Sequence, residues 1–543
     1  MSVVDWIILC VTLVSIIIYG IYKSRASKNM EGYFLSNRSM PWYLVLLSIM
    51  GTQASAITFI SAPGQAYTDG MRFVQYYFGL PIAMVVICIF FVPVFSKLKV
   101  YTAYEYLEHR FDLKTRSFTA ALFLISRGLS TGLSIYAPSI IISSLLGWNI
   151  YLTNLIMGGL LIIYTISGGA RAVAYTQQLQ LIIILCGMFL AGYIVVSMLP
   201  EGMGFLSAIE SAGSLGKMNI ITTGVKDGHF DWKDKYNIWS GLIGGFFLAL
   251  SYFGTDQSQV GRYLTAKSDR ESKIGLLMNG LIKIPMQFFI LLLGILVFAF
   301  YLHHKAPIYF DQVKRSEAIQ TSYGTQLQQI EQAYTTARLT KNYTQSDSLR
   351  NAYKSVMKKA LPGEDTNDTN YIFLRFVVDY LPKGLVGLLI AVIFLAAWGS
   401  IAAALNALAS STMVDFHQKI VTQPPSEKAA YALSKWYSFG WGVFSIIVAM
   451  FAHNIGNSLI EAVNILGSLF YGVMLGIFLV ALGIKYIKGN AVFWAAIVAE
   501  CLVIAIFLAD VISFLWLNLI GAILVVAISY LFQIILSFQR SKE

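Results

Sequence analysis

Small and polar side chains gather in the middle of one apolar stretch, "LLSIMGTQASAITFISAPGQAY", at residues 46–67. They are Gly51, Thr52, Gln53, Ser55, Thr58 and Ser61. Inside a lipid bilayer every backbone polar group must be satisfied, so a helix that unwinds there is tolerated only where it lines a cavity. Carriers use such breaks because freed carbonyl groups coordinate cations and half-helix ends attract charged solutes. The composition of this stretch therefore predicts an unwound helix segment that lines a binding site.

A second stretch, "GLIGGFFLALSYFGTDQSQVGRY" at 241–263, is interrupted by glycine in a similar way. The two stretches fall in the second and seventh apolar spans of the chain. If the first span is peripheral, they become helices one and six of a five-plus-five inverted repeat, the pairing typical of a midplane site. The alternative is that small residues only let helices pack closely. Two interrupted helices at matching positions favour transport.

Two basic residues lie within apolar spans and could bind an anion. Arg127 lies about 15 Å from the cytoplasmic end of its predicted helix, near mid-bilayer, where a charge is a functional hypothesis by default. Its guanidinium fits a carboxylate with two parallel hydrogen bonds; the alternative is a pair with another buried group. Lys283, about 9 Å from its helix end, contacts solute or extends to the interface. Glu461, three residues before Asn464, is expected to pair with Arg127 or to cap the outer helix end.

The composition places these residues in an all-α, polytopic membrane protein. Hydrophobic residues make up 57% of the 543 and charged residues 12%, against about a quarter in soluble proteins. The membrane environment explains the net charge of +11 better than nucleic-acid binding does. Thirteen apolar spans are predicted, near 4–22, 42–62, 73–95, 117–146, 150–168, 177–199, 238–254, 276–302, 377–412, 434–452, 458–483, 490–509 and 511–536.

Lysine and arginine alternate between loops in a way that predicts orientation. The loop after the first span, the 96–116 loop and the 255–275 loop each hold at least four of them. Short cytoplasmic loops collect such residues, so the N-terminus is expected outside and the C-terminus inside the plasma (inner) membrane. The polar segment 303–376 then lies outside, and one or two short surface helices are expected in it. A solvated insertion is favoured over a lid.

Seven segments resemble the sodium/solute symporter family, which includes sodium–glucose, sodium–iodide, monocarboxylate and sialic-acid carriers. They are "YFLSNRSMPWYLVLLSIMGTQASAITFI" (33–60), "APGQAYTDGMRF" (62–73), "YTAYEYLEHRF" (101–111), "IYAP" (135–138), "YTISGGARAVAYTQQLQ" (164–180), "GTDQSQVGRYLTAKS" (254–268) and "ALNALASSTMVDF" (404–416). The resemblance implies a leucine-transporter-type fold. Its parts would be a peripheral first helix and loop (1–30), a first repeat (31–236), a second repeat with the outer insertion (237–483) and peripheral C-terminal helices (484–543).

The resemblance also implies a sodium site. Its positions fall on the carbonyls of Gly51, Ala54 and Ala396 and on a hydroxyl pair at Gly399 and Ser400. Gly399 has no hydroxyl, so a water, Thr52 or Gln53 replaces that ligand, or sodium binds more weakly. Where some members place the aspartate and hydroxyls of a second sodium site, this chain has Gln177, Ala402 and Ala403. One sodium per solute is therefore expected, with an electrogenic cycle unless the solute is an anion.

The family's solute-contacting positions complete the predicted site. They map to Gln53, Ser55, Thr58, Tyr76, Tyr77, Leu80, Ala249, Tyr252, Lys283, Val463 and Asn464, with Arg127 near the arginine of sialic-acid carriers. The sugar-type pattern needs an amide, a carboxylate and an amide where this chain has Thr58, Tyr77 and Ala249. Ser55 and Thr58 match hydroxyls of the sialic-acid pattern, and Tyr252 occupies an inner-gate position.

The sequence predicts a sodium-coupled symporter, working by alternating access, for a small carboxylate-bearing solute. An acidic sugar such as sialic acid, a monocarboxylate and a vitamin are the candidate classes. Sodium-independent or proton-coupled transport, and transport of a neutral sugar or polyol, are the alternatives. Neither an H-E-x-x-H nor a G-x-S-x-G motif is present in the sequence, so an enzyme is not expected. Sodium is the expected coupling ion, and no organic cofactor is expected.

Overall fold

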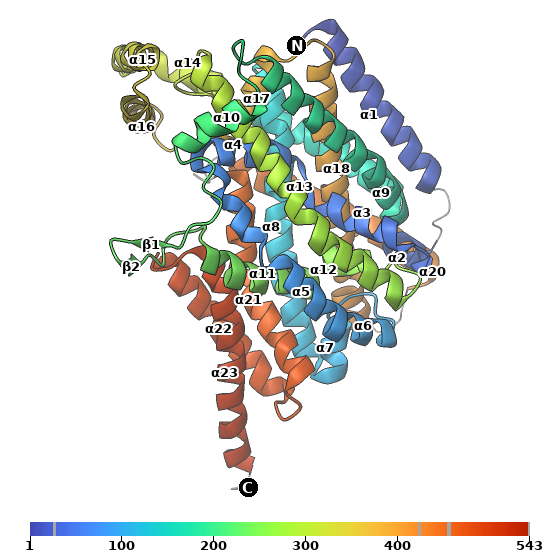
Figure 1. The fold of residues 1–543 in the computed structure, drawn as a ribbon. Coiled ribbons are helices and arrows are strands. Elements are labelled where there is room, and N and C mark those ends of the chain that lie inside the picture. The colour runs from blue at the N-terminus through green and yellow to red at the C-terminus, as the bar shows by residue number, and fades with distance from the viewer. Residues whose placement is uncertain (25–28, 422–424, 453–457, 541–543) are drawn as a thin grey trace.

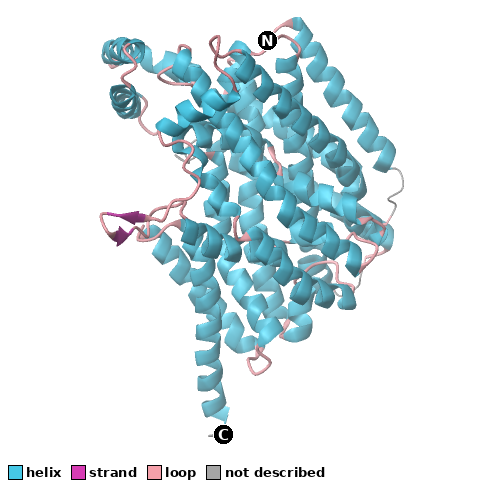
Figure 2. Ribbon diagram, viewed as in Figure 1, coloured by secondary structure: helices cyan, strands magenta, loops and turns pink. Residues whose placement is uncertain are grey.

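Long helices packed side by side build the protein (Figure 1). The computed structural model describes residues 1–24, 29–421, 425–452 and 458–540. Figure 2 shows that helix dominates these residues. The strands among them form one antiparallel hairpin, in which β1 (Val225–Lys226) pairs with β2 (His229–Phe230).

The first part of the chain forms ten α-helices and three shorter helical segments. They are α1 (Val3–Ser24), α2 (Met30–Leu35), η1 (Ser36–Arg38), α3 (Trp42–Gln53), α4 (Ala56–Asp69), η2 (Gly70–Tyr77), α5 (Leu80–Val86), η3 (Ile87–Phe91), α6 (Val92–Leu98), α7 (Glu105–Arg110), α8 (Leu113–Leu146), α9 (Ile150–Ser197) and α10 (Phe205–Ser214).

The second part follows the hairpin. Its elements are η4 (Ser240–Gly244), α11 (Gly245–Thr255), α12 (Gln257–Tyr263), α13 (Asp269–His303), α14 (Gln312–Ile319), α15 (Gly324–Leu339), α16 (Tyr343–Ala360), α17 (Thr369–Tyr380), α18 (Leu385–Ser411), η5 (Thr412–His417), α19 (Gln418–Ile420), α20 (Glu427–Phe451), α21 (Leu459–Gly483), α22 (Gly489–Leu508) and α23 (Phe514–Arg540). Segments η1 and η2 are 3₁₀-helices, and η3, η4 and η5 are π-helical turns.

Eight helical segments among the described residues are long and apolar enough to cross a membrane, and four shorter helices are also apolar. The two spans expected at 150–168 and 177–199 are present as two apolar runs, Ile150–Ile166 and Val173–Ser197, within the 48-residue helical element α9. The residues between the runs include three alanines, which are strong helix formers.

The polar segment 303–376, which was predicted to lie outside, contains more structure than expected. Three helices, α14, α15 and α16, form there and α17 begins, where one or two were predicted. Asp311 and Asn342 cap α14 and α16 with their side-chain oxygens, and a small core that includes Tyr353 and Met357 packs the three helices together. Although burial opposes ionisation, Arg350 and Lys354 hold the pKa of Asp368 below its ordinary value. In Figure 1 these helices lie at the same end as the N-terminus.

Both predicted interruptions are present. In the first, the amide of Ala54 donates to the carbonyl of Met50 at 2.7 Å, and helical bonding then stops until α4 begins at Ala56. In the second, Asp256 is extended between α11 and α12, and its carboxylate accepts the amide of Ser258 at 2.8 Å. This break follows the glycines of 241–245 rather than falling on them.

Those glycines serve close packing, as the alternative interpretation held. A Cβ on Gly241 would lie 2.2 Å from the carbonyl oxygen of Gln75, and one on Gly245 would lie 2.5 Å from that of Tyr76. A glycine in α4, the second half of the first broken helix, also allows two backbones to approach closely. A Cβ on Gly64 in α4 would lie 2.1 Å from the carbonyl oxygen of Thr369 in α17.

We expect Gly64→Ala to lower the free energy of unfolding by about 1–3 kcal/mol, because the backbone of Thr369 cannot yield as a side chain would. Denaturant unfolding of the detergent-purified protein measures the loss. Gly159→Ala is the matched control, since no atom lies within 4 Å of a Cβ at that position in α9. Equal stability of the two variants would contradict this description of the α4–α17 contact.

Candidate functional site

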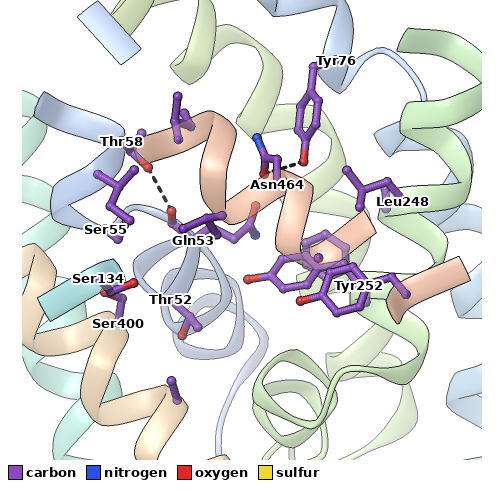
Figure 3. A pocket seen from close by; sticks show the side chains of 18 of the residues that line it. Thr52, Gln53, Ser55, Thr58, Tyr76, Ser134, Leu248, Tyr252, Ser400 and Asn464 are labelled. Atoms are coloured by element: carbon purple, nitrogen blue, oxygen red, sulfur yellow. Dashed lines mark hydrogen bonds between the residues drawn. The ribbon is translucent and has the colours of Figure 1, made fainter. Parts of the chain in front are cut away.

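A cavity of about 150 Å³ lies between the two broken helices. All twelve predicted solute-contacting residues line it, together with Ser400. The twelve are Gln53, Ser55, Thr58, Tyr76, Tyr77, Leu80, Arg127, Ala249, Tyr252, Lys283, Val463 and Asn464. Figure 3 shows several of them arriving from separate elements and facing one space. The structure thus brings the set together, and its role in solute binding stays a prediction.

Hydrogen bonds fix the unwound turn between α3 and α4. The hydroxyl of Thr58 donates to the carbonyl of Gln53 at 3.1 Å, as Figure 3 shows. The side-chain amide of Gln53 donates to Asn279 on α13 at 3.1 Å, and the hydroxyl of Thr52 donates to the carbonyl of Ser48 at 2.8 Å. The two side chains suggested as substitutes for the missing sodium ligand at Gly399 are therefore already held by the protein.

Aromatic rings cover one side of the cavity. The hydroxyl of Tyr76 donates to the side-chain oxygen of Asn464 at 3.0 Å, and the rings of Tyr76 and Tyr77 meet edge to face at 4.7 Å. The side-chain nitrogen of Asn464 is buried and has no hydrogen-bond partner among the described residues. It is a donor available to a polar solute.

Arg127 is held by a buried carboxylate that the sequence analysis did not identify. Its guanidinium donates to Asp256, at the second break, and to the hydroxyl of Tyr471 at 3.0 Å. The same hydroxyl donates to Asp256 at 2.7 Å. Arg127 therefore brings no net charge to the cavity. The signal for Asp256 was its place as the one acid in "GTDQSQ", the end of the second interrupted stretch.

The expected pairing of Glu461 with Arg127 is wrong. Glu461 lies in the first turn of α21 and pairs with Lys235 from the loop before η4. A carboxylate in the first turn of a helix is stabilised by the partial positive charge of that end, which agrees with the other expectation for Glu461, that it caps the outer helix end.

Lys283 is the unbalanced charge of the cavity. It is 2% exposed, so it does not extend to the interface as one alternative held. Its ammonium group lies 5.6 Å from the ring centroid of Tyr77. Across the described part of the chain no carboxylate lies within 4.0 Å of it, and no acidic residue lines the cavity. With Arg127 paired to Asp256, Lys283 is the basic group of the cavity that has no carboxylate partner among the described residues.

The predicted sodium positions lie beside the cavity, at the first break and on α18. The break frees the carbonyls of Gly51 and Ala54 from the helical pattern, since the amide of Thr58 bonds Ser55 instead. On α18 the hydroxyl of Ser400 donates to the carbonyls of Ala396 and Ala397, each at 3.0 Å. This back-bonding still leaves acceptor lone pairs on the hydroxyl. Every potential ligand at these positions is an oxygen atom, the type of ligand that hard cations prefer.

Gln177 occupies the position where some members of the resembled family hold a second sodium with an aspartate. It is 1% exposed, and its amide nitrogen donates to the hydroxyl of Thr52 at 3.3 Å and to the carbonyl of Gly399 at 3.1 Å. The hydroxyl of Ser48 donates to its amide oxygen at 3.1 Å. The amide therefore joins α3 to α18 through α9 with neutral hydrogen bonds, and it leaves no carboxylate for an ion.

The fold and the cavity are those of a membrane transporter with two interrupted helices. A family model described as sodium:solute symporter family matches residues 33–337 and 350–499. The chain belongs to this family, whose members are sodium-coupled membrane transporters and not enzymes. It is thus a multi-pass membrane protein.

Individual relatives agree with this assignment. A sodium/sialic acid symporter of Aliivibrio fischeri is 24% identical over 97% of this chain and 92% of its own. A sodium-dependent multivitamin transporter of Oryctolagus cuniculus is 27% identical over 88% of this chain and 66% of its own. A solved structure of a Na⁺-coupled sialic acid symporter in a substrate-bound outward-open state covers 98% of each chain with a TM-score of 0.79 and 22% identity. That likeness shows the shared fold.

Removing one partner of the buried Arg127–Asp256 pair is expected to destabilise the protein strongly, and removing both partners is expected to destabilise it less than the sum of the single changes. Asp256→Asn and Arg127→Met should each lower the free energy of unfolding by about 3–5 kcal/mol, because each leaves one buried charge without its partner. The double variant should cost clearly less than the sum, since neither charge is then stranded. Thermal unfolding of the purified variants gives the three values.

Asp510→Asn is the control for this cycle, because it removes the exposed partner of Lys233, a pair worth at most about 1 kcal/mol. Strictly additive losses for Arg127 and Asp256 would mean that the two side chains do not depend on each other.

Proposed function

We propose that this protein is a sodium-coupled symporter that imports a small organic solute bearing one carboxylate. The observation that carries the proposal is the set of basic groups in the cavity. Two basic side chains line it, no acidic residue lines it across the described part of the chain, and only Arg127 has a carboxylate partner. A buried charge without a partner is costly, so a solute carboxylate beside Lys283 would stabilise the protonated amine.

Arg127 can still take part without supplying the charge. Its Nε is buried and unpartnered among the described residues, while its Nη2 binds Asp256 and Tyr471. An Nε–H donor and the free amide nitrogen of Asn464 then orient the solute by hydrogen bonds. In this assignment Lys283 selects for the anion, and Arg127 and Asn464 position it.

The size of the cavity favours the smaller solutes of the class. A cavity of about 150 Å³ is close to one that, engineered into another protein, holds benzene. A small monocarboxylate fits this conformation, and an acidic sugar such as sialic acid requires the cavity to widen. Thr58, Tyr77 and Ala249 replace the polar groups of the sugar-type pattern, which weighs against a neutral sugar or polyol.

The transport cycle that we propose alternates access to this cavity. Sodium bound by the oxygens of Gly51, Ala54, Ala396 and Ser400 joins the first break to α18 and preorganises the solute site. Solute binding then permits closure, and loss of sodium to the cytoplasm releases the inner half. Each step requires that sodium and solute bind one state better than the other. About one sodium moves with each solute, since Gln177 replaces the acid of a second site.

The proposal includes thirteen transmembrane helices in the plasma (inner) membrane. The two repeats run over 31–236 and 237–483, with α3–α4 and α11–α12 as the first and sixth core helices. The N-terminus lies outside, supported by the basic loops and by the termini at opposite ends in Figure 1. Part of the first basic loop (25–28) and the chain end (541–543) lie outside the described residues.

Uptake into proteoliposomes tests the function. We expect an inward sodium gradient to stimulate uptake of at least one labelled carboxylate, from a panel of lactate, pantothenate and sialic acid, with galactose and proline as neutral and zwitterionic comparisons. The smallest carboxylates should be the best substrates. A carboxylate carried equally well without sodium would overturn the coupling and favour a proton-coupled or sodium-independent carrier, and a preference for galactose would overturn the anion assignment.

The role of Lys283 has its own test. Lys283→Gln should raise the half-saturating concentration of the transported anion about 10- to 100-fold, because a charge-assisted hydrogen bond is lost. Lys283→Arg keeps the charge and should retain part of the affinity. Lys485→Gln removes an exposed lysine and serves as the control. Unchanged half-saturation in Lys283→Gln would exclude Lys283 as the group that binds the anion.

A further inference from the structure

We propose that the side-chain amide of Gln180 supplies the sodium ligand that Gly399 lacks. This inference rests on the sodium-coupled function proposed above. The carrying observation is a distance: a Cβ built on Gly399 would lie 2.6 Å from Oε1 of Gln180. The amide oxygen from α9 therefore occupies the space in which a serine or threonine side chain at position 399 would lie.

The Gln180 side chain is buried and not used by the protein. It is 3% exposed, and its amide nitrogen has no hydrogen-bond partner in the part of the chain that the structure describes. Buried polar groups without partners are uncommon because they forfeit their bonds to water. Amide oxygens are suitable ligands for hard cations. A sodium ion at Oε1 would use the acceptor end of this side chain next to Gly399, while the buried Nε2 is a donor that the ion does not satisfy.

Gln177 holds this wall of the site in place. It precedes Gln180 by three residues, so both side chains project from the same face of α9. Gln177 donates to the carbonyl of Gly399 at 3.1 Å, and its Cγ lies 3.1 Å from the Cβ position of that glycine. One amide thus fixes the backbone at 399, while the next fills the space of its missing side chain. Glycine at 399 and glutamine at 180 are a matched pair.

Exchange of the two groups tests the proposal. Gln180→Ala should raise the half-saturating sodium concentration about tenfold or more. Adding Gly399→Ser to that variant should bring it back to within about threefold of the wild-type value, because the hydroxyl enters the vacated space. Gln180→Glu keeps an oxygen there and adds charge, so its half-saturating sodium concentration should fall below that of the wild type.

Two readouts separate a ligand from a structural role. The first is uptake at varied sodium and saturating solute. The second, independent of transport, is the sodium concentration that stabilises the purified protein against heat, with potassium as the reference ion. Gln178→Ala, a half-buried neighbour on α9, is the matched control and should leave both unchanged.

The outcomes distinguish this inference from the function on which it rests. A wild-type protein without sodium-dependent uptake or stabilisation would overturn the proposed coupling. A sodium-dependent wild type with normal sodium affinity in Gln180→Ala would overturn the ligand role alone. Weakened sodium binding that Gly399→Ser fails to restore would also overturn it, since the amide would then act by packing.

Discussion

The ion pair between Arg127 and Asp256 is the interaction on which the centre of the molecule depends. It joins α8 to the second helix break, and the hydroxyl of Tyr471 adds α21 to the same group. Because the pair neutralises the arginine inside the bundle, Lys283 is left as the unpartnered basic group of the cavity. The anion recognition that we propose therefore depends on a contact that does not itself bind the anion.

Much of the site could be predicted from the sequence, because helix breaks inside apolar spans have a distinct composition. The resemblance to sodium/solute symporters then indicated twelve side chains that the structure gathers around one cavity. The partner of Arg127 could not be predicted, since Asp256 and Glu461 are both acids at span ends and only tertiary packing selects between them. Hydropathy located the two apolar runs of α9 but could not show that they form one helical element, because it reports apolar runs and not helix ends.

The positions at which this chain departs from the family's sodium pattern have one property in common, the loss of an oxygen ligand or of its negative charge. Position 399 has no hydroxyl, position 177 has an amide instead of an acid, and positions 402 and 403 are alanine. The structure shows what takes their place: the amide of Gln177 bonds across α3 and α18, where some relatives use an ion. This contact between α3, α9 and α18 is made by neutral groups that are always present.

Under the proposed cycle, that neutral contact would limit how far the solute can be concentrated. With one sodium and one monovalent anion per cycle, no net charge would cross the membrane, so the membrane potential would contribute nothing to accumulation. A tenfold sodium ratio, about 1.4 kcal/mol, would then support at most about a tenfold solute ratio. A second coupled ion would square that ratio and add the potential. On this proposal, the amide at residue 177 suits a carrier of solutes that are consumed soon after entry.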